Sequence, residues 1–238
     1  MVSKKYTHLF FDLDNTLWDF DTSSRLAMHK TFMHYQLDRQ CALFPFFFDT
    51  YSRINILLWD EYKKGKLIKK ELVRQRFQMT FDEMNITGID AVSVNTFYLE
   101  EMPHQGRLMP GAEEMLVYLK KRGYTLFIIT NGFREVQYKK LEVAGIAKFF
   151  EKVFISEEIK ATKPSREIFE YAVKSANARK NRCMMIGDDF DADIVGAISF
   201  NMDAVYFNPK KLPVGGTIIN NKHFLLEINS LTIVNNIL

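Results

Sequence analysis

Short apolar runs alternate with amphipathic helical patterns over most of the chain. The apolar runs end at polar residues or glycine, and they cover residues 6–11, 126–130, 153–156, 184–187 and 204–207. The helical patterns cover residues 110–122, 134–144, 165–176 and 192–200. Short buried strands that alternate with helices of this length are typical of a parallel, doubly wound sheet, so the pattern predicts an α/β fold. A weaker pattern from Lys222 onward indicates a short strand or loop followed by a helix.

One long interval, residues 22–104, interrupts this alternation with helical periodicity throughout. Its clearest helices cover residues 46–63 and 70–84, and Gly65 and Gly88 break the pattern. We interpret the interval as an inserted α-helical domain. The α/β core then consists of the flanking residues 1–21 and 105–238.

Aromatic side chains are concentrated early in this inserted domain. Helices bury such side chains routinely, so we expect these residues to form the domain's core. They are Phe44, Phe46, Phe47, Phe48 and Trp59.

Composition and charge exclude several classes of protein. Hydrophobic residues make up 47% and charged residues 26% of the 238 residues, which is an ordinary globular balance. With 32 basic and 29 acidic residues and no dense Lys/Arg block, we expect no nucleic-acid polymer as a partner. No apolar run approaches the length of a membrane span, so we expect no membrane partner either.

The cysteine count indicates the cellular compartment. Cys41 and Cys183 are too few and too far apart for a disulfide framework or a clustered zinc site. This usage fits a reducing cytoplasm, which is the location we expect. The oligomeric state stays open.

Unusual polar residues follow the predicted strands or precede a helix. In chain order they are Asp12, Asp14, Thr130, Asn131, Lys163, Asp188, Asp189 and Asp193. In open α/β sheets, ligands bind outside the carboxyl ends of the strands. We therefore expect these side chains to meet at one rim of the sheet.

The acidic residues among them predict a metal site. Asp12 and Asp14 are alternate residues of an extended segment, so both carboxylates can face one substrate. Asp188 would add a third carboxylate, and such a cluster is unfavourable unless a cation neutralises it or a proton is retained. Oxygen ligands select a hard cation, and we predict Mg²⁺. A calcium loop is excluded, because the sixth position of either acidic segment is Leu17 or Ile194 instead of glycine.

Four motifs taken together resemble those of the haloacid dehalogenase-like superfamily of hydrolases. They are Phe11-Asp12-Leu13-Asp14-Asn15-Thr16-Leu17, Ile129-Thr130-Asn131-Gly132, Lys163-Pro164, and Gly187-Asp188 followed by Asp193. Their order and spacing agree with the superfamily, and the helical insertion lies where its type-I cap domain sits. Asp189 departs from the commoner serine or threonine after Gly-Asp, which leaves open whether Asp189 touches the metal.

Within this superfamily the chain resembles the YjjG-type pyrimidine 5′-nucleotidases. The similar residues are Leu58-Trp59, Tyr62 and Gly65 in the inserted domain, residues 129–133, and Ile155-Ser156-Glu157-Glu158 before Lys163-Pro164. The resemblance implies a phosphatase acting on a small phosphorylated metabolite, with nucleoside 5′-monophosphates as the expected substrates.

The resemblance to the superfamily also implies a role for each site residue. Asp12 would attack phosphorus and form an aspartyl-phosphate, while Asp14 would protonate the leaving oxygen and then activate water. Mg²⁺ would be held by Asp12, Asp188 and the backbone carbonyl of Asp14. The substrate phosphate would be bound by Thr130, Asn131 and Lys163. The supporting positions would be those of Asp193 and Asp189.

Other functions share part of this pattern. A phosphomutase or a sugar phosphatase of the same superfamily would carry the same four motifs. A dehalogenase also uses an aspartate nucleophile but has no leaving alkoxide to protonate, so Asp14 argues against it. A catalytically silent binding module on this fold would not need the intact set of acidic residues and Lys163. The physiological substrate and the cap residues that select it stay open.

Overall fold

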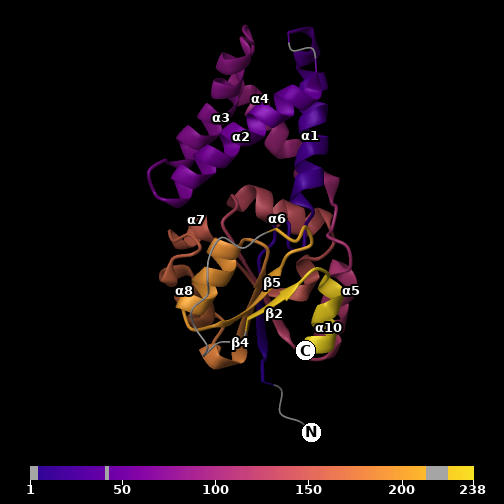
Figure 1. The fold of residues 1–238 in the computed structure, drawn as a ribbon, viewed down its shortest axis with the longest axis vertical. Coiled ribbons are helices and arrows are strands. Elements are labelled where there is room, and N and C mark those ends of the chain that lie inside the picture. The colour runs from indigo at the N-terminus through magenta and orange to yellow at the C-terminus, as the bar shows by residue number, and fades with distance from the viewer. Residues whose placement is uncertain (1–4, 41–42, 213–224) are drawn as a thin grey trace. The chain divides into compact units, whose positions relative to one another are not determined.

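The computed structural model describes residues 5–40, 43–212 and 225–238. The chain divides into two compact units. The first comprises the described residues of Met1–Phe20 and Gly106–Leu238, and the second comprises those of Asp21–Gln105 (Figure 1).

The first unit contains a parallel sheet, which confirms the predicted α/β fold. Its strands are β1 (His8–Phe11), β2 (Thr125–Thr130), β3 (Phe150–Ile155), β4 (Cys183–Gly187), β5 (Asp203–Phe207) and β6 (Leu225–Ile228). Among the described residues the strand order is β3-β2-β1-β4-β5-β6, and every pair is parallel. The chain builds outward from β1 to β3 and then returns to β4 on the other side of β1. Such a reversal opens a crevice at the carboxyl ends of the two central strands.

Helices cover both faces of this sheet. They are α5 (Ala112–Lys121), α6 (Arg134–Val143), α7 (Ser156–Ile159), α8 (Arg166–Ser175), α9 (Gly196–Ser199) and α10 (Val234–Ile237). In Figure 1, α8 lies on one side of the strands, and α5 and α10 lie together on the other. Because both faces are covered, the adjacent residues Leu9 and Phe10 are both inaccessible to solvent although they point in opposite directions.

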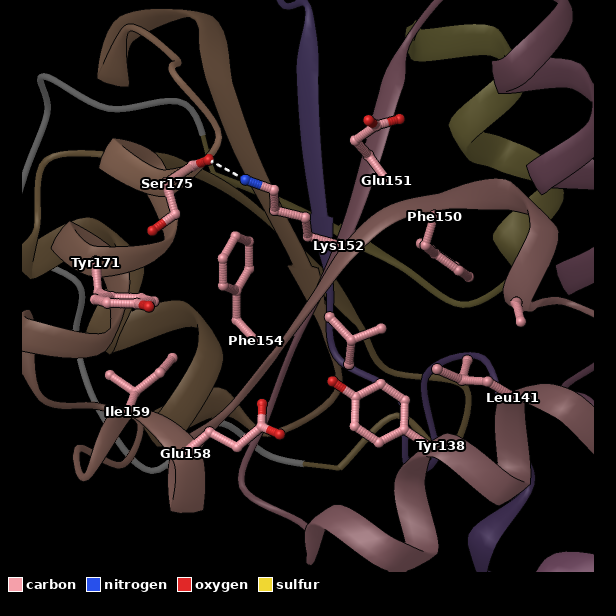
Figure 2. A pocket seen from close by; sticks show the side chains of 12 residues that line it. Tyr138, Leu141, Phe150, Glu151, Lys152, Phe154, Glu158, Ile159, Tyr171 and Ser175 are labelled. Atoms are coloured by element: carbon pink, nitrogen blue, oxygen red, sulfur yellow. Dashed lines mark hydrogen bonds between the residues drawn. The ribbon is translucent and has the colours of Figure 1, made fainter.

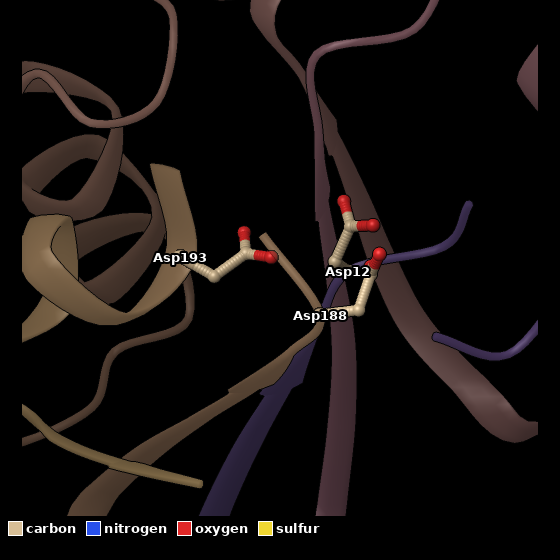
Figure 3. Close-up of side chains that lie close together, drawn as sticks. All are labelled: Asp12, Asp188 and Asp193. Carbon is tan, nitrogen blue, oxygen red and sulfur yellow. The ribbon is translucent and has the colours of Figure 1, made fainter. Parts of the chain in front are cut away.

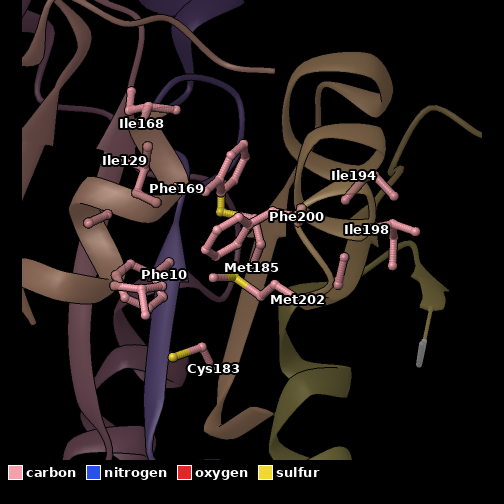
Figure 4. Close-up of a cluster of buried hydrophobic side chains, with 14 of the residues drawn as sticks. Phe10, Ile129, Ile168, Phe169, Cys183, Met185, Ile194, Ile198, Phe200 and Met202 are labelled. Atoms are coloured by element: carbon pink, nitrogen blue, oxygen red, sulfur yellow. The ribbon is translucent and has the colours of Figure 1, made fainter. Parts of the chain in front are cut away.

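A hydrophobic cluster fills one face of the sheet (Figure 4). Phe10 of β1 and Phe127 of β2 enter it with stacked rings whose centroids are 4.9 Å apart. Ile168 and Phe169 of α8 enter it from the helical layer. Each buried side chain of this size stabilises the fold by about 1.5–3 kcal/mol. The cluster therefore holds the strands, and with them the residues at their ends, in fixed positions.

The predicted helix over residues 192–200 is wrong in its first turn. The chain instead forms a π-helical turn over Phe190–Val195, followed by α9. The Asp189 carboxylate accepts a hydrogen bond from the backbone N–H of Ala192 at 3.0 Å and so caps the turn. π-helical turns often occur at functional sites, and this one carries Asp193, which is 0% exposed.

The C-terminal segment agrees with the prediction of a strand or loop followed by a helix. β6 is followed by a 3₁₀ turn over Leu231–Ile233 and then by α10. Lys222, where the predicted segment starts, lies outside the described residues. The Tyr124 hydroxyl donates a hydrogen bond to the Leu238 carbonyl at 2.7 Å, which ties the chain end to the segment before β2.

The second unit is built from helices around an aromatic core. They are α1 (Phe20–His34), α2 (Phe44–Lys63), α3 (Lys69–Met84) and α4 (Ala91–Glu101). The ring of Phe77 lies 4.8 Å from that of Tyr51 and 6.0 Å from that of Tyr98, measured between centroids. Pro45 lies in the first turn of α2, where a residue needs no hydrogen-bonded N–H. None of the described helices is both long enough and apolar enough to cross a membrane.

The aromatic residues of α2 are only partly in this core. Phe47 is fully buried, but the expectation for Phe46 is wrong, because its side chain is 65% exposed. Adjacent residues on a helix point about 100° apart, so both cannot face the same interior. Phe44, Phe48 and Trp59 are half-buried.

Alanine substitutions at these two adjacent positions test the core of the second unit. Phe47→Ala leaves a cavity and should lower the free energy of unfolding by about 3–5 kcal/mol. Phe46→Ala, the matched control, should change it by no more than about 0.5 kcal/mol. Urea unfolding followed by circular dichroism measures both values. Similar losses of unfolding free energy in the two variants would contradict the conclusion that Phe47 is in the core and Phe46 is not.

Candidate active site

The candidate site lies at the carboxyl ends of β1 and β4, where the strand order reverses. Asp12 directly follows β1, and Asp188 directly follows β4. The backbone N–H of Asp12 donates to the Ile186 carbonyl at 2.9 Å, which joins the two strand ends. Two carboxylates that are far apart in the sequence are therefore adjacent in the sheet.

A third carboxylate and a lysine complete this group. Asp12, Asp188 and Asp193 each present an oxygen, and these oxygens lie within 4.8 Å of one another (Figure 3). The Lys163 ammonium, from a residue that is 2% exposed, donates to Asp12 and, at 2.6 Å, to Asp193 Oδ1. Three carboxylates around one ammonium leave a formal charge of −2 in a largely buried space.

Burial and, after it, the neighbouring charges shift the pKa values of this group. Burial raises the pKa of Asp188 well above its usual range, and the charges of Asp12 and Asp193 raise it further. Burial also raises the pKa of Asp193 to about 7, although Lys163 opposes the shift. Burial disfavours the charge on Lys163, but Asp12 and Asp193 outweigh that effect and raise the pKa of the ammonium. A divalent cation would cancel the remaining charge, and carboxylate oxygens are suitable ligands for one.

Thr16 orients one of the three carboxylates. Its side chain is fully buried, and its hydroxyl donates to Asp188 Oδ1 at 2.8 Å. Thr16 belongs to the loop after β1, in which the backbone N–H groups of Leu17 and Trp18 both donate to the Leu13 carbonyl. The sequence pattern includes Thr16 in the first motif but predicts no role for it. Its hydroxyl links the loop after β1 to the end of β4.

The position of Asp193 depends on the last residue of β4 and on a residue just after the strand. The backbone N–H of Asp189 donates to Asp193 Oδ2 at 3.1 Å, so Asp189 reaches the site through Asp193. Position 187 has room only for glycine, because a Cβ atom there would lie 2.2 Å from Asp193 Oδ2. A larger residue at this strand end would displace the carboxylate.

Thr130 is the last residue of β2 and Asn131 follows it, and both are held by hydrogen bonds. Thr130 Oγ1 accepts from Gln137 Nε2 at 2.6 Å and from the Gly132 N–H at 3.1 Å. The Asn131 side chain donates to the Lys163 carbonyl at 3.0 Å and accepts from the Lys163 N–H at 2.8 Å. Asn131 therefore braces the backbone at Lys163, a contact that the sequence pattern does not predict.

Asp14 is not one of the three clustered carboxylates, and it has partners of its own. Lys140 Nζ donates to Asp14 Oδ1 at 2.5 Å, and Gln137 Nε2 donates to Asp14 Oδ2 at 3.0 Å. Both donors lie on α6 and are buried. The sequence pattern did not predict them, because long polar side chains on helices are mostly exposed. One feature of the sequence could have indicated their burial. Gln137 and Lys140 are three residues apart, so they share a helix face, and the apolar residues Val136 and Leu141 are their neighbours.

A surface cavity of about 540 Å³ lies elsewhere, along the edge strand β3. Tyr138 of α6, Phe154 of β3 and Tyr171 of α8 line it (Figure 2). Beside them, the Lys152 ammonium donates to the Ser175 carbonyl at 2.7 Å. None of the residues predicted for the site lines this cavity, so the carboxylate group and the cavity are separate features.

Comparison with known proteins finds similar sequences over most of the chain. The sequence model of the haloacid dehalogenase-like hydrolase family matches residues 6–201. The chain is 32% identical over 210 residues to the pyrimidine 5′-nucleotidase PynA of Streptococcus pneumoniae, which covers 87% of this chain and 86% of PynA. It is 30% identical over 205 residues to the pyrimidine 5′-nucleotidase YjjG of Escherichia coli, which covers 86% of this chain and 87% of YjjG.

A solved structure shares the fold over nearly the whole chain. The crystal structure of the HAD-hydrolase YfnB from Bacillus subtilis, bound to magnesium, is similar with a TM-score of 0.85. Sequence identity is 29%, and the match covers 98% of this chain and 99% of YfnB.

The substitution Gly187→Ala tests the close packing around Asp193. The added methyl group would displace the Asp193 carboxylate, so we expect the free energy of unfolding to fall by about 1–3 kcal/mol. Denaturant unfolding measures the change. A variant as stable as the unmodified chain would show that the two residues do not approach each other so closely.

Proposed function

The chain belongs to the haloacid dehalogenase-like hydrolase family, and from that premise we propose that it is a magnesium-dependent phosphatase. It hydrolyses small phosphate monoesters through an aspartyl-phosphate on Asp12. The observation that carries the proposal is the buried Lys163 ammonium held by Asp12 and Asp193 beside Asp188. This arrangement keeps a carboxylate nucleophile next to a fixed positive charge, as phosphoryl transfer requires.

The chemistry uses two aspartates. Asp12 attacks the phosphorus atom in line, the bond between phosphorus and the ester oxygen breaks, and the leaving oxygen takes a proton from Asp14. A water molecule then attacks the phosphorus of the aspartyl-phosphate, gives a proton to Asp14, and releases phosphate from Asp12. One slow reaction is thereby divided into two faster steps, and both aspartates return to their starting states.

Thr130 and Lys163 bind the transferred phosphoryl group. Thr130 Oγ1 already accepts hydrogen bonds from Gln137 and Gly132, which occupy both of its lone pairs. Its own O–H proton is therefore available to a phosphoryl oxygen. Lys163 contributes positive charge, and Asn131 contributes its backbone N–H while its side chain keeps Lys163 in place.

Asp12 and Asp188 are the side chains that would hold Mg²⁺, together with the backbone carbonyl of Asp14. Asp193 is left out of this set, because its Oδ1 is bonded to Lys163 and its Oδ2 to a backbone N–H. When bound, the ion would neutralise charge on the substrate phosphate and orient it toward Asp12. The formal charge of −2 around Lys163 supports a divalent ion in this place.

We propose nucleoside 5′-monophosphates as the preferred substrates. PynA and YjjG, both named as pyrimidine 5′-nucleotidases, support this class. The core residues recognise only phosphate and metal, so we assign substrate selection to the helical unit of Asp21–Gln105, acting as a cap domain. The low cysteine count favours a cytoplasmic location, where the partner would be a small phosphorylated metabolite.

Chelation tests the metal requirement. Phosphate release should stop in excess chelator and return when Mg²⁺ is added back. Asp188→Ala should raise the Mg²⁺ concentration for half-maximal activity by at least about tenfold. Asp191→Ala, which removes an exposed carboxylate close by, is the matched control and should leave it unchanged. Full activity in excess chelator would contradict the metal-dependent mechanism.

Relative kcat/KM values test the substrate class. The values for dUMP, dTMP and UMP should exceed those for glucose 6-phosphate and β-glucose 1-phosphate by about tenfold or more, since a pocket built for one group rejects others by such factors. A preference for the sugar phosphates would reject the nucleotidase assignment and leave the phosphatase core intact. Interconversion of the two glucose phosphates without net phosphate release would instead identify a phosphomutase.

A further inference from the structure

Two buried polar residues of α6 contact Asp14, and the mechanism above gives neither of them a role in proton transfer. Lys140 is 1% exposed and Gln137 is 0% exposed. Removing an ammonium from water costs several kcal/mol unless its charge is compensated. Burial indeed lowers the pKa of Lys140, and the charge of Asp14 opposes this shift. Because burying the Lys140 ammonium costs stability, we look for the reason for its burial in the group that it contacts.

Both residues contact the same carboxylate from different sides. Lys140 Nζ lies 2.5 Å from Asp14 Oδ1, and Gln137 Nε2 lies 3.0 Å from Asp14 Oδ2. One donor on each oxygen prevents the carboxylate from rotating about its terminal bond. A carboxylate offers about four acceptor positions, so each oxygen keeps one lone pair for a proton.

The two donors are themselves held in place. Lys140 Nζ lies 4.5 Å from the ring centroid of Trp18 and 5.2 Å from that of Phe20, so aromatic faces support the ammonium. A Cβ atom on Gly132 would lie 2.3 Å from Gln137 Nε2, so the chain packs closely against this amide. Gln137 Oε1 has no hydrogen-bond partner among the described residues, which indicates that the amide is kept for its donor.

Gln137 also connects two parts of the reaction. The same Nε2 that donates to Asp14 donates to Thr130 Oγ1 at 2.6 Å. In the proposed function, the Thr130 hydroxyl donates a hydrogen bond to a phosphoryl oxygen of the substrate. The position of the proton-transfer group is therefore set relative to the position of the phosphate.

We propose that Lys140 and Gln137 are positioning residues that hold the Asp14 carboxylate in line with the leaving oxygen. They act through Asp14 and do not touch the substrate. The inference rests on the proposed role of Asp14 as general acid and base, and it adds the two residues that give this role its geometry.

Leaving-group dependence tests the inference in Lys140→Met, which keeps most of the buried stem and removes the ammonium. A nucleoside 5′-monophosphate has an alkoxide leaving group that needs a proton, whereas p-nitrophenolate needs none. The ratio kcat/KM reports only the steps up to loss of the leaving group, so it excludes the hydrolysis step that both substrates share. Because general acid catalysis contributes roughly 100-fold or more, kcat/KM should fall by about 100-fold for the nucleotide and by less than about fivefold for p-nitrophenyl phosphate. Lys139→Met, the same substitution at the adjacent residue of α6, should leave both rates unchanged.

A double variant separates positioning from a general effect on the fold. If Lys140 acts through Asp14, adding Lys140→Met to Asp14→Asn should cause no further loss of activity. Gln137→Met removes the other donor to Asp14 and also a partner of Thr130, so it should lower activity on both substrates, but clearly more on the nucleotide. This excess loss keeps the test valid if Lys140→Met does not fold. Equal losses on both substrates, or additive losses in the double variant, would overturn the inference. Failure of the proposed function would look different, because the unmodified chain would then release no phosphate from either substrate.

Discussion

A single ammonium group in the interior governs the arrangement of the active site. Lys163 lies between Asp12 and Asp193, and the nearby Asp188 leaves the group with an excess of negative charge. Buried ions of this kind stabilise a fold weakly or not at all, and a group with one partner missing is strongly unfavourable. Every member must therefore be held in place by other parts of the chain. The Asn131 side chain bonds to both the N–H and the carbonyl of Lys163, and the Thr16 hydroxyl donates to Asp188.

The sheet supplies the rigidity that this group requires. The central strands β1 and β4 are buried on both faces, so the residues directly after them have little freedom to move apart. Their carboxylates meet because the strand order reverses between these two strands. In the proposed function, a divalent cation would neutralise this charge, and together with Lys163 it would attract a phosphate dianion. The excess negative charge around Lys163 does not stabilise the fold, and in this account its purpose is to bind the metal ion.

The regular part of this architecture could be predicted from the sequence, since buried parallel strands are short apolar runs that end at polar residues. Most of the eight polar residues could be singled out for the same reason, because they lie at or just after strand ends, whereas Lys163 precedes a helix. Prediction failed where side chains override local preference. The cap formed by Asp189 and the inward position of Asp193 produce a π-helical turn where the periodicity predicts a regular helix. Lys140 and Gln137 were missed because their burial depends on Asp14, which lies far away in the sequence.

The central claim is that phosphate passes through the carboxylate of Asp12. Acid quenching during the first turnover, followed by mass spectrometry of peptides, measures this directly. The account predicts a phosphorylated Asp12 that forms before the steady state, and no phosphorylated aspartate in the Asp12→Asn variant. Release of phosphate with no phosphorylated Asp12 at any quench time would contradict the account.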